Sequence, residues 1–211
     1  MNEVIAGLAR LGSATVYEAS GRRGLIDVPL RQIVPGSRAA GPARTVLCGQ
    51  GDNLMVHAAM AAARPGDVLV VTMPEPAAVA VLGDLLATQA KARGVAAVLV
   101  DAGVRDVEEL VALGLPIWAR FVSIRGPVKH TANDLDQTVF VGGQRIEAGD
   151  IVVLDADGAV VIAQTDLAQT YAASLDREQH EQRRREQFEA GALSYDLDGL
   201  RAIVEPSSPS D

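Results

Sequence analysis

The feature that most constrains the fold is an uninterrupted apolar run, VAAVLVD at residues 95–101, lying between two segments with helical patterning. A strand with one solvent-facing side alternates apolar and polar residues, whereas a strand buried on both faces is apolar throughout. The stretch VLVVT at 68–72 also has the composition of a strand. We therefore expect a sheet whose central strands are covered on both faces.

The core must be built from small and branched aliphatic side chains. Hydrophobic residues make up 48% of the 211-residue chain, but aromatic residues make up only 3%. Such a composition suits sheets covered by alanine-rich helices, and a chain of this length can bury the core of one compact domain.

Helical spacing and turn residues divide the chain into a mixed α/β order. Helices are expected at 2–21, in two pieces with Ser13 or Thr15 capping the second, and at 54–64, 84–93 and 107–114. Strands are expected at 43–49, 68–72, 95–101 and 115–120. A long loop is expected at 73–84, a polar irregular segment at 121–141, and a β-meander at 142–163 that turns at Asp157-Gly158. From Thr165 a long charged helix with one apolar stripe leads to the polar tail SSPSD.

Charge and composition exclude several classes of partner. The net charge of −8 argues against a nucleic-acid or anionic-membrane surface, because such binding relies on Lys and Arg neutralising phosphates. No apolar stretch approaches the roughly 18 residues of a membrane helix, and the N-terminus lacks the basic start of a secretory signal. Cys48 is the one cysteine and is expected to be a small buried hydrophobe. A cytoplasmic protein is the expectation.

Three charged residues form the best candidate site. Asp84 is followed, after twenty residues, by Arg105 and Asp106, in a segment that reads as loop, helix, buried strand and loop. One such crossover unit brings its two loops together, so two oxygen ligands and a guanidinium would gather around a small anion. This set suits Mg²⁺-assisted chemistry on a keto acid. The alternative is structural: Asp84 and Asp106 are both placed to cap helices, with Arg105 paired to a surface carboxylate.

Other polar residues favour structural interpretations. His57 lies in an alanine-rich helix and is expected to be a satisfied, partly buried histidine, while His130 and His180 are expected to be solvated. No His spacing typical of zinc sites occurs, and DADG at 155–158 favours a hairpin turn over a Ca²⁺ loop. No phosphate-binding glycine motif and no covalent-hydrolase motif is found.

Several segments together resemble a known family. GDNLMVHAAMAAARPGDVLVV, GDLLATQAKARGV, DAGVRDVEEL, LPIWARFVSIRGPVK and AGDIVVLDADGAVVI are similar to the class II pyruvate aldolases, which cleave 4-hydroxy-4-methyl-2-oxoglutarate or 4-carboxy-4-hydroxy-2-oxoadipate. The resemblance covers most of the chain from Asn53 onward. These aldolases are related to the RraA-like regulators of ribonuclease activity.

The resemblance implies an α-β-β-α sandwich related to phosphohistidine swivelling domains, with an aldolase domain at 1–164 and a helical extension at 165–211 packing on a neighbouring subunit. It implies Mg²⁺ or Mn²⁺ held by Asp106 directly and by Asp84 through water. Arg105 would bind a 2-keto acid substrate and act in catalysis with Asp84. The loop from Gly83 and the amides of Leu85 and Leu86 would bind the substrate's carboxylate. The resemblance also implies a trimer or hexamer in which Glu181 of the adjacent subunit supplies a catalytic acid to the site.

Two other functions remain open at this point. A non-catalytic regulator of a ribonuclease shares the fold but typically lacks an acid after the arginine, so Asp106 favours an enzyme. A dedicated oxaloacetate decarboxylase, or an aldolase for another 2-keto acid, would use the same residues, and oxaloacetate decarboxylation is expected at least as a side activity.

Overall fold

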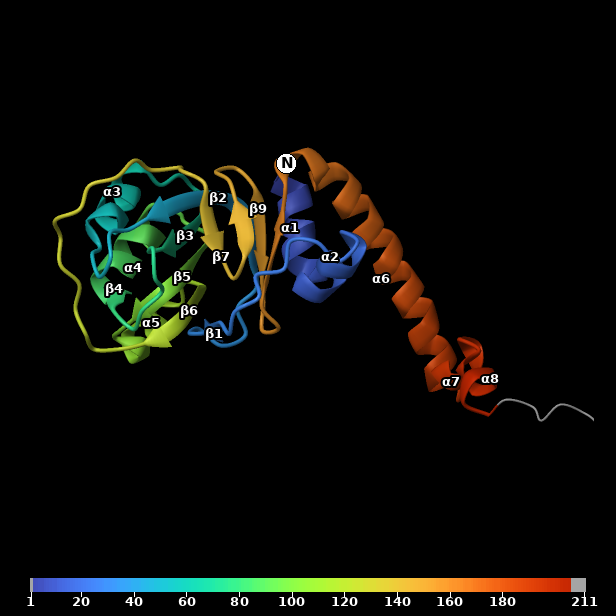
Figure 1. The fold of residues 1–211 in the computed structure, drawn as a ribbon. Helices are drawn as coiled ribbons and strands as arrows, with labels where there is room; N and C mark the ends of the chain where they lie inside the picture. The colour runs from blue at the N-terminus through green and yellow to red at the C-terminus, as the bar shows by residue number, and fades with distance from the viewer. Residues whose placement is uncertain (1, 206–211) are drawn as a thin grey trace, which may run out of the picture. The chain divides into compact units, whose positions relative to one another are not determined.

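A curled, mixed sheet forms the centre of the protein. The computed structural model describes residues 2–205, and within them eight strands form one sheet in the order β1-β6-β5-β3-β2-β9-β10, with β4 paired to β5 (Figure 1). These strands are β1 (Arg31–Gln32), β2 (Ala39–Leu47), β3 (Val68–Thr72), β4 (Ala80–Leu82), β5 (Ala97–Val104), β6 (Ile117–Val122), β9 (Ile151–Leu154) and β10 (Ala159–Ile162). Neighbours among β2 to β6 run parallel, whereas β1, β9 and β10 pair antiparallel.

Helices cover the sheet from two sides. On one side lie α3 (Leu54–Ala62), α4 (Asp84–Ala92) and α5 (Val107–Leu113); α1 (Asn2–Leu11) and α2 (Ser13–Ala19) pack against β2, β9 and β10. A small ribbon of β7 (Val139–Val141) and β8 (Gln144–Ile146) packs on the opposite face from α3. The layers follow the expected α-β-β-α order, so the predicted fold is confirmed.

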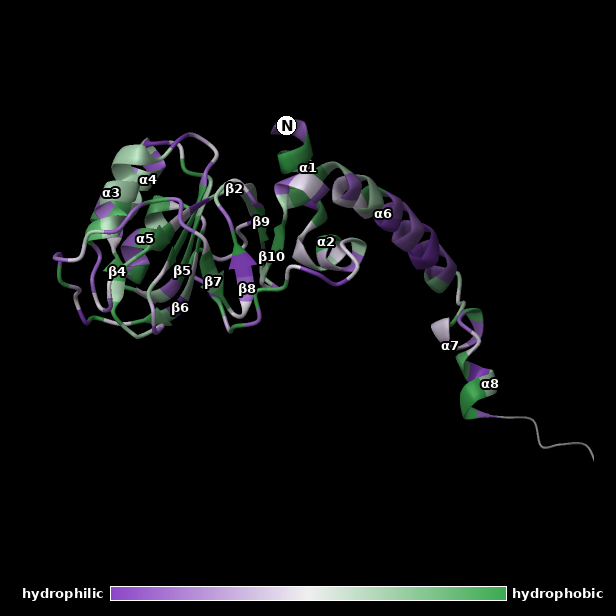
Figure 2. Cartoon of the chain, turned by 45° about the horizontal axis from the view of Figure 1, so that its top comes forward, coloured by the Kyte–Doolittle hydropathy of each residue, from purple (hydrophilic) through white to green (hydrophobic). Residues whose placement is uncertain are grey.

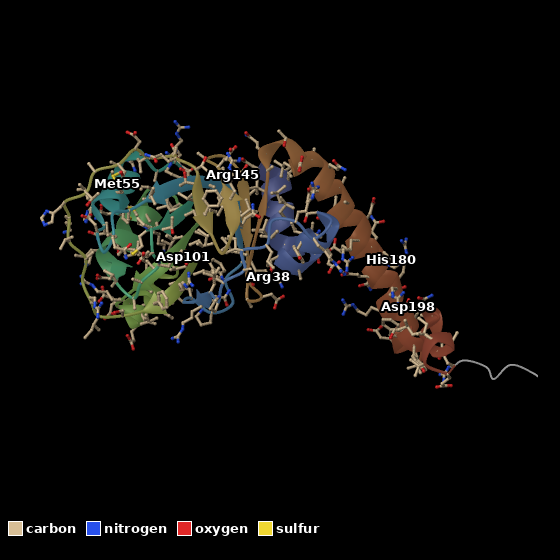
Figure 3. All side chains as sticks on the ribbon, in the orientation of Figure 1. Arg38, Met55, Asp101, Arg145, His180 and Asp198 are labelled. Atoms are coloured by element: carbon tan, nitrogen blue, oxygen red, sulfur yellow. The ribbon has the colours of Figure 1, made fainter. Side chains whose placement is uncertain are left out.

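Burial of β5 explains its unbroken apolar sequence. Every residue of this strand is buried, since helices cover one face and the β7–β8 ribbon and its neighbours cover the other. Figure 2 shows the central strands of the sheet as mainly hydrophobic. Asp101 is the polar exception on β5, and it lies inside the fold, where Arg120 Nη1 donates to its Oδ1 at 3.0 Å (Figure 3).

Two expected strand arrangements are wrong. The long loop at 73–84 contains β4, which pairs with the C-terminal end of β5 across an irregular register. The segment 142–163 is not one meander, because β8 pairs with β7 in a separate ribbon, and only β9 and β10 form the hairpin that turns at Asp157-Gly158. The two errors have different causes: β4 takes its partner from β5, a separate strand beyond α4, whereas β8 pairs locally with β7, a three-residue strand inside the segment expected to be irregular.

The expected side-chain cap of α2 is also wrong. Gly12 holds the N-cap position, and both the amide and the hydroxyl of Ser13 donate to the carboxylate of Asp155, at 2.7 and 2.6 Å. The side chain that would cap the helix is therefore used to join it to the β9–β10 turn. Asp155 is thereby explained as a structural carboxylate.

The C-terminal residues form a second compact unit. Residues 1–174 make one unit and 175–211 another, with the division inside the long helix α6 (Leu167–Glu189). In the second unit, Arg184 makes a two-point ion pair with Asp198, and α7 (Ser194–Leu197) and α8 (Leu200–Val204) bury no side chain. The predicted long charged helix is confirmed, but the two residues it buries are Thr170 and Ser174 rather than an apolar stripe. The tail SSPSD lies outside the described residues.

Candidate functional site

A cavity of about 240 Å³ opens at the N-terminus of α4. The residues that line it come from α3, β4, α4, the end of β5 and the segment 123–138: Asn53, His57, Ala80, Val81, Gly83, Asp84, Leu85, Leu86, Arg105, Gly126, Pro127 and Lys129. The structure thus brings together Gly83, Asp84, the two leucines and Arg105, as the sequence predicted. Asp106 lies beside this lining and contacts two of its members.

Asp106 is joined to the start of α4. Its Oδ2 accepts a hydrogen bond from the amide of Asp84 at 3.1 Å and lies 3.5 Å from Arg105 Nε. Gly83 makes this approach possible, because a Cβ at that position would stand 2.5 Å from the same carboxylate oxygen. The acid, the guanidinium and the helix start therefore form one cluster across twenty residues of sequence.

The expectation that the Asp106 side chain caps α5 is wrong. The residue does occupy the N-cap position of α5, but its side chain makes no capping bond to that helix and turns to α4 instead. Its backbone is left-handed, with φ 63° and ψ 47°, a conformation that asparagine and aspartate tolerate better than most residues. Strained backbone of this kind is concentrated at functional sites.

The first turn of α4 offers free donors to the cavity. Gly83 caps this helix without a side-chain bond, and its carbonyl accepts from Ala87. Among the residues described, no acceptor bonds to the amides of Leu85 and Leu86, which the geometry of a helix start leaves unpaired. Such amides, with the positive end of the helix dipole, favour an anionic group.

Two polar atoms in the cavity lining lack partners. The Asn53 side chain is 5% exposed, and its Nδ2 donates to the carbonyl of Val81 at 3.0 Å, which fixes its Oδ1 as an acceptor with no donor. His57 Nε2, one helical turn along α3, is also buried without a partner. Because orphaned buried polar atoms are costly, this pair indicates space for a polar ligand.

This pair did not emerge from the sequence. The expectation of a satisfied His57 is wrong. Asn53 holds the N-cap position of α3 without a side-chain capping bond, and the Leu54 amide donates to Asp52 Oδ1 at 2.7 Å instead. The spacing of four between Asn53 and His57 was the available signal, since it places both on one helical face.

Lys129 adds a second cation to the cavity lining, beside Arg105. Figure 1 shows its segment, 123–138, running in yellow around the outside of α3, α4 and α5. Burial lowers the pKa of His57, and the nearby charge of Lys129 lowers it further, so the imidazole is neutral at pH 7. The lining therefore combines two basic side chains, Arg105 and Lys129, and the carboxylate of Asp84 with neutral polar groups, which suits a small anion together with a cation.

The donor set fits a hydrated Mg²⁺ rather than an all-protein cage. Within residues 2–205, no three His, Cys, Asp or Glu side chains gather closely enough to hold a metal ion. Mg²⁺ commonly binds through one or two carboxylates and keeps water or substrate oxygens as its other ligands. Asp106 and Asp84 are the two carboxylates available here.

Glu181 belongs to the C-terminal unit. It lies on α6, where its Oε1 is 2.8 Å from Arg177 Nε, and it lines a separate hollow with Arg184, Arg185 and Phe188. The first unit supplies every residue of the cavity described above. A role for Glu181 at another subunit's site stays a prediction.

Comparison with known proteins assigns the family. Residues 13–161 match the family model described as "RraA-like: Aldolase/RraA". The chain belongs to the RraA-like family. The matched range contains the whole α4 cavity and Asp106, and it ends before the helix α6.

The relatives of this RraA-like protein differ in what their names say. A protein of Halalkalibacterium halodurans named "Putative 4-hydroxy-4-methyl-2-oxoglutarate aldolase" is 37% identical over 133 residues, which span 63% of each chain. An uncharacterized protein from Pseudomonas syringae pv. tomato superposes with a TM-score of 0.80 at 23% identity, covering 92% of this chain and 95% of that one. A Streptomyces coelicolor protein, described as an unusual member of the RNase ES inhibitor RraA family, has a TM-score of 0.73 at 29% identity, covering 88% and 96%.

The described helices also bear on membrane insertion. None of them is both long and apolar enough to cross a bilayer.

Proposed function

We propose that this RraA-like protein is a class II pyruvate aldolase. In the proposed reaction it cleaves 4-carboxy-4-hydroxy-2-oxoadipate to pyruvate and oxaloacetate, or 4-hydroxy-4-methyl-2-oxoglutarate to two molecules of pyruvate. Asp106 supports this function most, because a ribonuclease regulator needs no acid beside Arg105, whereas a metal-dependent lyase does. Its bond to the start of α4 places that acid beside a cavity with two cations.

The two carboxylates would hold a divalent ion, Mg²⁺ or Mn²⁺. Asp106 would bind it directly, and Asp84 would bind it through water. An ion held there supplies Lewis-acid stabilisation of negative charge on the keto oxygen.

The protein's own groups would bind and orient the pyruvyl part of the substrate. The free amides of Leu85 and Leu86 suit its carboxylate, and Arg105 suits its keto oxygen. When the bond between C3 and C4 breaks, its electron pair stays on C3 as an enolate, and Arg105 opposes the charge that develops on the enolate oxygen. The proton of the C4 hydroxyl passes to water as C4 becomes a ketone, and C3 then takes up a proton to give pyruvate.

Oxaloacetate decarboxylation should accompany aldol cleavage. Loss of CO₂ from oxaloacetate leaves the same pyruvate enolate, so the same groups would stabilise it. A protein whose main activity is this decarboxylation is the second enzymatic candidate.

Regulation of a ribonuclease is the candidate from another class. The Streptomyces coelicolor relative is described as belonging to an inhibitor family, and its structure covers most of this chain. Binding of that kind would not depend on Asp106 or on a divalent ion.

One set of assays separates the candidates. Turnover of the carboxylated oxoadipate, the methylated oxoglutarate and oxaloacetate would be compared at equal enzyme concentration with Mg²⁺ present. The proposal expects the highest kcat/KM for one of the two aldols. A preference for oxaloacetate would favour the decarboxylase, and no turnover of any of the three, with inhibition of a ribonuclease, would favour the regulator.

A further inference from the structure

The cavity depends on a segment that has almost no regular structure of its own. Between the end of β6 and the start of β7, residues 123–138 form no helix and no strand beyond an isolated bridge, yet they supply Gly126, Pro127 and Lys129 to the lining. Lys129 is exposed and lies on this segment. Its side chain can serve a ligand only if something fixes the backbone on both sides of it.

Asp52 supplies that fixation on the C-terminal side of Lys129. Its Oδ2 accepts from the amides of His130 at 2.6 Å and Thr131 at 2.8 Å, while its Oδ1 accepts from the amide of Leu54 at 2.7 Å. The residue is 1% exposed, so solvent does not compete for these bonds. One carboxylate therefore ties the segment to the start of α3.

Backbone bonds complete the attachment on the N-terminal side. The amide of Asn53 donates to the carbonyl of Val128, and the amide of Val128 donates to the carbonyl of Gly51, both at 3.0 Å. We call residues 51–53 together with 128–131 the clasp. Asn53 and Lys129 are the clasp residues that line the cavity, and Lys129 is the charged one.

Gly49 allows a second close contact between the clasp and the rest of the protein. A Cβ at this position would stand 2.5 Å from the Cβ of Thr131, so only glycine allows the segment to lie this close to the end of β2. Further along the segment, the amide of Asn133 donates to Sδ of Met55 at 3.2 Å. Met55 lies on α3 and is labelled in Figure 3.

We infer that Asp52 is a positioning residue for substrate binding: its buried carboxylate holds the clasp, and the clasp holds Lys129 at the cavity, where its ammonium receives a carboxylate of the substrate. This inference rests on the proposed function for the identity of the ligand. Asp52 itself touches no substrate, so its effect must pass through Lys129.

Substitution of Asp52 by asparagine is the direct test. Asparagine keeps the size of the side chain but replaces one acceptor oxygen by an amide nitrogen that faces a backbone donor. We expect KM for the aldol substrate to rise about tenfold with kcat reduced much less, because the lost contact is remote from the breaking bond. We expect Lys129→Ala to raise KM by a similar factor.

A double-mutant cycle separates positioning from general damage. If Asp52 acts through Lys129, the combined Asp52→Asn and Lys129→Ala variant should have the KM of Lys129→Ala alone. Hydrogen exchange at the His130 and Thr131 amides should be faster in Asp52→Asn. Additive effects on KM, or an unchanged KM in Asp52→Asn, would overturn the inference.

Two further variants serve as controls. Asp155→Asn alters another buried carboxylate, one that accepts from two amides and a hydroxyl and does not line the cavity, and it should leave KM unchanged. Gly49→Ala disturbs the clasp without touching Asp52, so it should raise KM only while Lys129 is present, even if Asp52→Asn fails to fold. A KM unaffected by Gly49→Ala would count against the clasp.

The design distinguishes failure of the inference from failure of the proposed function. If the wild-type protein does not turn over either aldol, the proposed function is wrong. If it does, and Lys129→Ala leaves KM unchanged, the aldolase assignment stands and the role of the clasp is wrong.

Discussion

At Asp106 one residue combines a strained backbone with a side chain that serves a distant helix. Its left-handed conformation costs on the order of 1 kcal/mol or more. A simple helix cap would use ordinary extended backbone and bond to its own helix, and Asp106 does neither. Chemistry at the neighbouring cavity is the simplest reason for keeping an acid in this geometry.

Gly83→Ala should reduce activity without unfolding the protein. The backbone of Gly83 has φ −137° and ψ −170°, which alanine adopts freely, so the cost is the contact between the new methyl group and Asp106 Oδ2. Displacing that carboxylate by about 1 Å can cost on the order of 100-fold in kcat. Steady-state kinetics and thermal unfolding of the variant provide the check. Wild-type kcat in Gly83→Ala would show that the close approach has no catalytic role.

At the level of single residues, the sequence predicted which charged side chains gather around the cavity, but not which hydrogen bonds position the remaining lining residues. The cluster of Asp84, Arg105 and Asp106 followed from a crossover unit, since its two loops must meet. Lys129 and Asn53 could not be found in that way, because they are brought in by an irregular segment and by the start of another helix. Their positions depend on Asp52, whose partners lie almost eighty residues away in sequence.

At the level of elements, the strongly patterned segments were predicted and the short strands were not. The core strands β3 and β5 and the helices α3 to α5 follow from apolar runs and helix spacing. The strand β4 escaped notice because it has three residues and gains its burial from β5. Since β4 leads directly into Gly83, that strand also sets where the cavity begins.

The clasp between α3 and the segment 123–138 should weaken in acid. Burial alone would raise the pKa of Asp52, but the amides of Leu54, His130 and Thr131 outweigh it and the net pKa is lowered. A lowered pKa means that the carboxylate stabilises the fold fully above the unfolded-state pKa, about 3.9, and loses this contribution as pH falls through the lower folded-state value. The difference in unfolding free energy between wild type and Asp52→Asn should therefore be largest near neutral pH and shrink below about pH 4.

Denaturant unfolding of both proteins between pH 7 and pH 3 measures this difference. Asp155→Asn serves as the comparison for a buried carboxylate outside the clasp. A difference for Asp52→Asn that stays constant down to pH 3 would mean that its carboxylate is not the group being titrated.

At the level of the whole molecule, the described part of the C-terminal unit buries little of its own apolar surface. Its helices α7 and α8 bury nothing, and several large apolar side chains in this unit are exposed: Phe188, Leu193, Leu197, Leu200, Ile203 and Val204. We propose that this extension packs on a neighbouring subunit of a homotrimer or homohexamer and lends Glu181 to the site there.

Mixing two inactive variants tests the shared site. Arg105→Ala and Glu181→Gln should each be nearly inactive alone, but a mixed oligomer would contain sites with Arg105 from one protomer and Glu181 from the other. Activity should therefore return after the two proteins are dissociated and reassembled together. Glu189→Gln should behave as wild type, and a mixture that stays inactive despite proven subunit exchange would place both residues in one protomer's site or exclude Glu181.

Removal of divalent ions should stop turnover reversibly. The two carboxylates at the cavity make few protein bonds to an ion, so extended dialysis against EDTA should remove it. Added Mg²⁺ or Mn²⁺ should restore pyruvate release in the wild type and not in Asp106→Ala. Full activity after thorough metal removal would favour a metal-free route.

The most direct measurement is pyruvate release from 4-carboxy-4-hydroxy-2-oxoadipate by the wild type, Arg105→Ala and Asp106→Ala, each with saturating Mg²⁺ and verified folding. The guanidinium and the acid are each expected to provide about 2–4 kcal/mol of transition-state stabilisation, so either substitution should lower kcat/KM by roughly 30-fold to 1000-fold. Near-wild-type release from either variant would contradict the assignment of this cavity as an aldolase site.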